Sequence, residues 1–380
     1  MIEDLGQSQA LLLALVEDTD EITCRSQYHP DLSPLGWHLG HSVYTECLWL
    51  HEKLRGDNSI TAPIEDFYTP PRTPKAERGE RLPRRSDLLM WSREIQAFNL
   101  HMLLNLRPEW QSHPLLENDY LIHFLLQHNS QHYETMLMIL TQKSLAEYRP
   151  DADTPARGLE AAALQRDSVE VPAGPYHIGG ERPVAYDNEL PRQQADLDPY
   201  RIGRRPVSNA EYLGFIEAGG YRDAHLWDTA GRAWLQASGA GHPDHWRRSP
   251  DGRWFALGIH GACELVADEP VSGISHHEAS AFARWADARL PHEYQWEAAC
   301  RIGALEHTGR VWEWCGNTFQ PYDGFTPFPY NEYSQPWFDD RHYSLKGGSL
   351  HTRPAIKRPS FRNFFEADKR HVFAGLRLAY

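Results

Sequence analysis

Apolar and polar positions follow different patterns in the two halves of the chain. Up to about residue 145, apolar residues recur every three to four positions, the spacing that lines one face of an α-helix. Four helices of this kind, separated by polar or proline-containing breaks, predict an antiparallel bundle. The predicted helices are Leu11–Thr19, Leu35–Leu54, Arg85–Leu106 and Glu117–Ser144.

The second half of the chain, from Asp167 onward, has short strand-like runs between Gly, Pro and Asn turns. The clearest predicted elements are strands at Val169–Val171 and Tyr176–Ile178 and helices at Asn209–Glu217 and His276–Ala286. Residues 322–341 are predicted to form a long aromatic loop, a feature typical of binding or catalysis. Residues 147–166 are rich in Ala, Asp, Arg and Pro and predict a linker between two domains, 1–150 and 168–380.

Length and charge limit the function classes. A chain of 380 residues exceeds one ordinary core, which favours two domains. The net charge of −14, with no long basic run, argues against nucleic acid or an anionic membrane as partner. The sequence contains no run of about 18 apolar residues, so it predicts no membrane span.

The N-terminus and the cysteines indicate the compartment. The first residues, Met1 to Asp4, lack the basic and apolar regions of a signal peptide. The five cysteines are odd in number and show no CxxC spacing, so reduced thiols are expected. We therefore expect a cytoplasmic protein.

Three histidines form the strongest candidate for chemistry. His128 and His132 stand four positions apart inside a predicted helix, so both side chains project from one face and can chelate one metal ion. His41, far upstream, supplies a third imidazole from another helix and leaves coordination positions open. The spacing alone is a weak signal, because 21 histidines produce chance pairs.

An ordered series of short motifs runs through the second half of the chain. It includes Val171-Pro172-Ala173-Gly174, Asn188-Glu189-Leu190-Pro191, Pro206-Val207-Ser208-Asn209, Arg289-Leu290-Pro291, Val311-Trp312-Glu313-Trp314, Gly347-Gly348-Ser349 and Gly375-Leu376-Arg377. The series resembles the formylglycine-generating-enzyme type of domain, a C-type-lectin-like fold. The first half resembles the DinB-type four-helix bundle, whose three-histidine metal site matches His41, His128 and His132. Together they imply an α+β chain, with the bundle first.

The two domains in this order resemble the iron-dependent sulfoxide synthases of ergothioneine and ovothiol biosynthesis and the related selenoneine synthases. The resemblance implies that His41, His128 and His132 hold Fe(II), and that O2 joins a sulfur or selenium donor to an imidazole. In the ergothioneine and selenoneine branches the acceptor is hercynine, the betaine of histidine. Ovothiol enzymes usually carry a further methyltransferase domain, and the end of the sequence at Tyr380 counts against that branch.

The resemblance also implies roles for other residues. Gln131 would hydrogen-bond the hercynine imidazole, Asn363 would contact the betaine, and Phe364 would pack near its trimethylammonium group, a contact that suits an aromatic ring. Tyr330 or Tyr333 matches the segment that supplies an active-site tyrosine, which would deliver a proton. Ordinary packing or solvent contact is the alternative for each of these side chains. Trp37, His38, Trp312 and Trp314 are expected to be structural.

The sulfur or selenium donor can belong to either of two chemical classes, a thiol amino acid or peptide, or a selenosugar. A cysteine or γ-glutamylcysteine donor needs arginines for its carboxylates. In that branch an Asp and then an Arg follow the Asn; here those positions hold Phe365 and Lys369, with Arg370 next. Phe365 would instead stack on a sugar, and segments such as Lys75–Gly79 are closest to the selenoneine synthases, which favours a selenosugar donor.

Two other activities are possible for chains built from these two folds. The related formylglycine generators use a pair of copper-binding cysteines, and no such pair is apparent here, so that activity is disfavoured. Both folds also occur in non-enzymatic metal-binding or sugar-binding proteins, which is the competing class.

Overall fold

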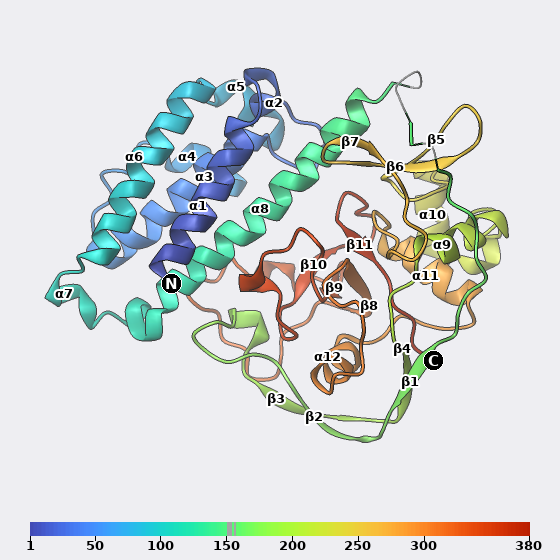
Figure 1. Ribbon diagram of the computed structural model, residues 1–380. Coiled ribbons are helices and arrows are strands. Elements are labelled where there is room, and N and C mark those ends of the chain that lie inside the picture. Colours follow the sequence, from blue (N-terminus) through green and yellow to red (C-terminus); the bar gives the residue numbers. More distant parts are fainter. Residues whose placement is uncertain (150–153, 156) are drawn as a thin grey trace. The chain divides into compact units, whose positions relative to one another are not determined.

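The structure is a computed structural model that describes residues 1–149, 154–155 and 157–380. The chain divides into two compact units, residues 1–147 with 182–184, and residues 148–181 with 185–380 (Figure 1). The first unit is helical and the second is rich in short strands, so the predicted α+β class is confirmed. None of the helices in the described part of the chain combines the length and the apolar character that a membrane span requires.

Four long helices form the bundle of the first unit. They are α1 (Ile2–Glu17), α3 (Leu35–Cys47), α6 (Arg85–Leu104) and α8 (Tyr120–Glu147). Helices α1 and α3 each pack against both α6 and α8, which closes the bundle around one core (Figure 1). The first helix begins nine residues earlier than predicted, because its first turns are mostly polar and their apolar residues are too few to mark a helix.

Shorter helical segments connect the long ones. They are α2 (Glu21–Arg25), a π-helical turn (Leu48–Lys53), α4 (Glu65–Tyr68), α5 (Arg78–Arg81), α7 (Pro108–Gln111) and 3₁₀ turns at Pro70–Arg72, Lys75–Glu77 and Pro114–Asp119. Helix α3 is buried along its whole length. It is therefore the central element of the unit, and a side chain on it faces protein on every side.

Among its described residues, the second unit contains four small sheets. Strands β10 (Asn363–Glu366), β9 (His342–Lys346), β8 (Trp312–Thr318) and β11 (Ala374–Gly375) form the largest, in that order, with only the β8/β11 pair parallel. The others are β1 (Ser168–Val171) with β4 (Tyr200–Gly203), β2 (Gly174–Ile178) with β3 (Gln193–Leu197), and β5 (Trp246–Arg248), β6 (Trp254–Gly258) and β7 (Gly261–Cys263).

Four helices accompany these sheets. They are α9 (Asn209–Glu217), α10 (Thr229–Ser238), α11 (His276–Trp285) and α12 (Glu293–Arg301), with 3₁₀ turns at Asp187–Glu189, Ala224–Leu226, Gln335–Trp337 and Pro354–Ile356. Helices α9 and α11 each begin with a Ser and Glu capping box, which satisfies otherwise unpaired N–H groups. Both lie where the sequence predicts them.

The predicted linker differs from the observed chain path. Residues 150–153 and 156 lie outside the described residues. Residues 157–166 are neither helix nor strand, but they are held by the second unit: the Ala162 amide donates to the Ala210 carbonyl at 2.9 Å. The Gln165 amide donates to the Glu211 carboxylate at 2.8 Å. This part of the segment is therefore anchored and does not form a free linker.

Candidate metal centre

The three predicted histidines lie together inside the helical bundle. His128 and His132 are one turn apart on α8, with ring centroids 4.4 Å apart, and His41 on α3 lies 4.8 Å from the His132 ring. One ring nitrogen from each residue can be chosen so that all three lie within 4.8 Å of one another. Such a triangle matches one metal ion bound by three imidazoles from two facing helices.

Burial keeps these imidazoles neutral. It lowers the pKa of His41 from 6.5 to about 4 and lowers the pKa values of His128 and His132 well below 6.5. A neutral imidazole has a free lone pair, and this is the form that binds a transition metal. The donor set therefore fits a borderline divalent metal such as iron, zinc or nickel.

A backbone contact fixes the orientation of His41. Its Nδ1–H donates to the Tyr68 carbonyl oxygen at 2.7 Å, so the Nε2 lone pair is free for a metal. Tyr68 comes this close because the neighbouring helix position is Gly40. A Cβ at Gly40 would lie 2.3 Å from the Tyr68 ring, so a larger residue would displace the ring.

A stacked tryptophan also supports His41, and an arginine supports the tryptophan in turn. The Trp37 ring stacks on the His41 ring with a centroid separation of 4.7 Å and an 8° tilt. The guanidinium of Arg78 lies 3.8 Å from the Trp37 ring centroid, and Arg78 donates to Ser33 and to the Thr73 carbonyl. Sequence reasoning missed the role of Arg78, because an arginine at the start of a one-turn helix such as α5 carries no signal of burial.

The remaining candidate of the first unit is Gln131. It precedes His132 on α8 and is half-buried. Its predicted contact with a substrate imidazole stays a prediction.

The other candidate residues belong to the second unit, where strand β10 carries Asn363, Phe364 and Phe365. Side chains alternate along a strand, so Asn363 and Phe365 share one face and Phe364 lies on the other. The Phe364 ring stacks on Phe319 with centroids 4.3 Å apart, which corresponds to the packing alternative. Asn363 and Phe365 are half-buried. Their predicted roles stay predictions.

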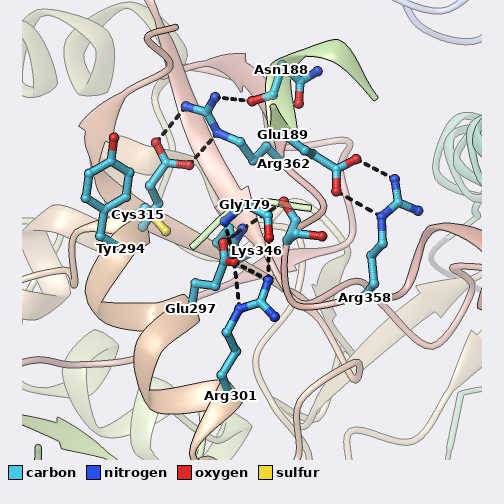
Figure 2. Close-up of polar contacts among 12 residues, drawn as sticks. Gly179, Asn188, Glu189, Tyr294, Glu297, Arg301, Cys315, Lys346, Arg358 and Arg362 are labelled. Carbon is cyan, nitrogen blue, oxygen red and sulfur yellow. Dashed lines mark hydrogen bonds and ion pairs between the residues drawn. The ribbon is translucent and has the colours of Figure 1, made fainter. Parts of the chain in front are cut away.

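Buried ion pairs anchor strand β10. Arg362, directly before the strand, donates to both carboxylate oxygens of Glu293 at 2.7 and 2.8 Å and to two backbone carbonyls. Lys346, on the paired strand β9, contacts Glu297 at 3.0 Å, and both are buried (Figure 2). These pairs hold the strand that carries the candidate binding residues.

The two cationic candidates are already paired with carboxylates. Arg370 binds Glu278 through two nitrogens, at 3.0 and 3.1 Å. Lys369 lies 3.1 Å from Glu366 and 3.3 Å from Asp368. Both side chains therefore have anionic partners within the protein.

The tyrosine segment is fixed by a buried carboxylate. Asp187 accepts hydrogen bonds from the Ser334 hydroxyl and the Phe328 amide, which flank Tyr330. Burial, with Asp187 nearby, raises the pKa of Tyr330, so its phenol keeps its proton. Tyr333 instead stacks on Tyr186 at 4.3 Å. The Tyr330 ring meets the Tyr333 ring edge-on, with centroids 6.3 Å apart, so both candidate proton donors have an aromatic neighbour.

All five cysteines are free thiols. Cys315, next to Trp314, is fully buried, and burial raises the pKa of its thiol. A buried thiol of this kind is unreactive.

Similarity to known proteins agrees with this architecture. Residues 4–136 match the DinB superfamily, and residues 156–308 and 301–380 match the sulfatase-modifying factor enzyme 1-like domain. A helical bundle with three convergent neutral histidines, followed by such a domain, defines a class of two-domain enzymes with a metal centre.

Two relatives that match this chain over almost their full length are hercynine oxygenases. Hercynine oxygenase of Mycolicibacterium smegmatis is 32% identical, over all of this chain and 98% of the relative. Hercynine oxygenase of Mycobacterium tuberculosis is 33% identical, over 99% of this chain and 97% of the relative. The formylglycine-generating enzyme of Thermomonospora curvata is 32% identical, but over only 45% of this chain.

The chain belongs to the hercynine oxygenase family, the ergothioneine type of sulfoxide synthase. It is therefore an enzyme, a metal-dependent oxygenase, and the non-enzymatic alternative is set aside. The expectation of an oxygenase is confirmed.

Proposed function

We propose that the protein uses O2 to form a carbon–selenium or carbon–sulfur bond on the imidazole ring of hercynine. The observation that carries this proposal is the triangle of neutral imidazoles from His41, His128 and His132, in a chain similar over its whole length to proteins named hercynine oxygenase. With a donor R–XH (X is selenium or sulfur), one O2 converts the donor and an imidazole C–H into an imidazole–X(=O)–R product and one water.

The proposed metal is Fe(II), bound by the three histidines. Iron would supply O2 activation and a binding position for the selenium or sulfur of the donor. The protein's own contribution is orientation: the Tyr68 carbonyl and the Trp37 ring hold His41 in one position. Because the ligands are buried and neutral, they bind a metal without first losing a proton.

Substrate contacts are proposed for three half-buried polar side chains. Gln131 would hydrogen-bond the hercynine imidazole and Asn363 the betaine. The Tyr330 phenol keeps its proton and would deliver it as the new bond forms, which favours coupling over simple oxidation of the donor.

For the donor, we propose a selenosugar. A cysteine or γ-glutamylcysteine donor brings carboxylates, which require unpaired cations. Arg370 and Lys369 are occupied by Glu278, Glu366 and Asp368, so recruiting them for a donor carboxylate would break existing ion pairs. A sugar has no such requirement, and Phe365 offers an aromatic ring for its face. The alternative is a thiol donor, cysteine or γ-glutamylcysteine, as expected for the ergothioneine type of sulfoxide synthase to which the chain belongs.

A competition experiment tests the proposal. Protein loaded anaerobically with Fe(II) receives hercynine with equimolar cysteine, γ-glutamylcysteine and selenosugar, then air, and products are identified by mass spectrometry. A selenium adduct as the main product is expected. A sulfoxide adduct would overturn the donor assignment, and no adduct would overturn the proposed reaction. The His128→Ala variant should form none, whereas His101→Ala, which removes an exposed histidine of the same unit, should retain activity.

A further inference from the structure

A fourth histidine contacts the metal centre from outside the triangle. His38 lies about one turn before His41 on α3 and is 6% exposed. Its Nδ1 atom is 2.9 Å from Nδ1 of His132, a hydrogen-bond distance. One of these two nitrogens must carry the proton, and the other must accept it.

The role of His132 decides the direction of this bond. Nδ1 of His132 is engaged by His38, so Nε2 is the nitrogen left to bind a metal. A neutral imidazole that offers Nε2 as a lone pair carries its proton on Nδ1. His132 is therefore the donor, and Nδ1 of His38 is the acceptor.

We propose that His38 is a positioning residue that accepts the Nδ1–H of His132 and so fixes its Nε2 lone pair toward the metal. The inference rests on the metal-binding role proposed for His132. Tyr68 does the same for His41 with a backbone carbonyl, whereas Nδ1 of His128 is buried without a hydrogen-bond partner in the part of the chain that the structure describes. Two of the three ligands are thus oriented by a second group, as is common for metal-binding histidines.

This arrangement is unfavourable for the fold on its own. With Nδ1 accepting, the proton of His38 sits on Nε2, which is buried and has no partner among the described residues. An apolar side chain of similar size avoids that unpaired donor. The His38→Phe variant leaves the Nδ1–H of His132 without its acceptor instead, so its stability should stay close to that of the wild type, while it binds metal less tightly.

The test compares His38→Phe with His38→Asn, whose side-chain oxygen can replace Nδ1 as acceptor. The full chain is titrated with Zn²⁺ against a competing chelator, and 15N-histidine spectra report the His132 tautomer in metal-free and zinc-loaded protein. We expect about 10- to 100-fold weaker zinc binding in His38→Phe. In His38→Asn, binding should stay within about threefold of the wild type. Thermal unfolding checks that both variants are folded.

The outcomes separate this proposal from the proposed function. Wild-type zinc affinity and an unchanged His132 tautomer in His38→Phe would overturn the role of His38. Equal weakening in both variants would also overturn it, because the acceptor would then not matter. If the wild type binds no zinc at this site, the proposed metal centre fails, whereas the tautomer of His132 in the metal-free chain still reports the direction of the hydrogen bond.

Discussion

A buried carboxylate in the helical bundle makes the stability of this protein dependent on pH. Glu46, on α3, is fully buried, and its oxygens accept hydrogen bonds from Gln9, Asn129 and Asn99 at 2.8, 3.0 and 3.2 Å. These partners are neutral amides. Burial therefore dominates and raises the pKa of Glu46 from 4.5 to about 7.

The sign of the effect follows from proton binding. Between pH 4.5 and about 7, the folded state holds the Glu46 proton and the unfolded state has lost it. The stabilisation is therefore fully present below the unfolded pKa and is lost as the pH rises through the folded pKa. At about 1.4 kcal/mol per pKa unit, the loss amounts to about 3 kcal/mol between pH 4.5 and pH 8.

Replacement of Glu46 by glutamine removes this dependence. Glutamine stays neutral, and its amide group requires an acceptor, which a flipped Asn129 amide provides: Oδ1 of Asn129 is buried and has no partner among the described residues. Relative to the wild type, Glu46→Gln should gain up to about 3 kcal/mol on going from pH 5 to pH 8. A constant offset from altered hydrogen bonds cancels in this comparison.

Hydrogen exchange measured by mass spectrometry provides the assay, with peptides from α3 and α8 reporting opening of the bundle. Comparing the two proteins at the same pH removes the intrinsic pH dependence of exchange. Peptides from the second unit serve as the internal control and should be unaffected. A variant-minus-wild-type difference that changes by less than about 0.5 kcal/mol between pH 5 and pH 8 would refute the reasoning.

Three further predictions concern the metal, the proton donor and a buried ion pair. His128→Ala should lose stoichiometric iron binding, measured as bound metal after gel filtration, whereas retained iron would reject the triad; His101→Ala is the control. Tyr330→Phe should lower coupling about 100-fold and increase oxidised donor, read by product ratio, and an unchanged ratio would exclude the phenol as proton donor. Arg362→Met should destabilise the protein by about 3 kcal/mol or more in chemical denaturation, because it leaves a buried carboxylate unpaired. Removing the exposed ion pair with Arg93→Ala should lower stability by less than about 1 kcal/mol, and equal losses would contradict the burial argument.

The fold could be predicted where local pattern and burial agree. Helix α6 begins at the predicted residue and α8 within three, because each has one apolar face or a long run without breakers. The sequence did not predict the strands of the largest sheet, β10-β9-β8-β11. In β8 the first four residues, Trp312–Cys315, are all buried, so no alternation marks them as a strand. Helix α10 was also missed, although Asp228 caps its start and Gly239, in the left-handed conformation, ends it.

For the metal centre, too, features within one helix could be predicted from the sequence, whereas contacts between distant segments could not. The spacing of His128 and His132 is a property of one helix, and their convergence could be predicted from the sequence. The groups that orient the ligands come from elsewhere in the fold. Tyr68 can approach His41 because position 40 is glycine, and Arg78 reaches Trp37 from the short helix α5. Contacts between distant segments leave no periodic signal.

The anchoring of strand β10 does not depend on the side chains that are proposed to contact the substrate. Arg362 ties the start of the strand to Glu293 and to backbone carbonyls of two other segments, and these contacts do not involve the side chains of Asn363 or Phe365. The strand position is therefore set independently of the residues proposed to meet substrate. A change at position 365 alters what the strand offers a donor without altering where the strand lies. Donor class can thus differ between relatives that share this framework, and residues 363–370 are where we expect that difference to be encoded.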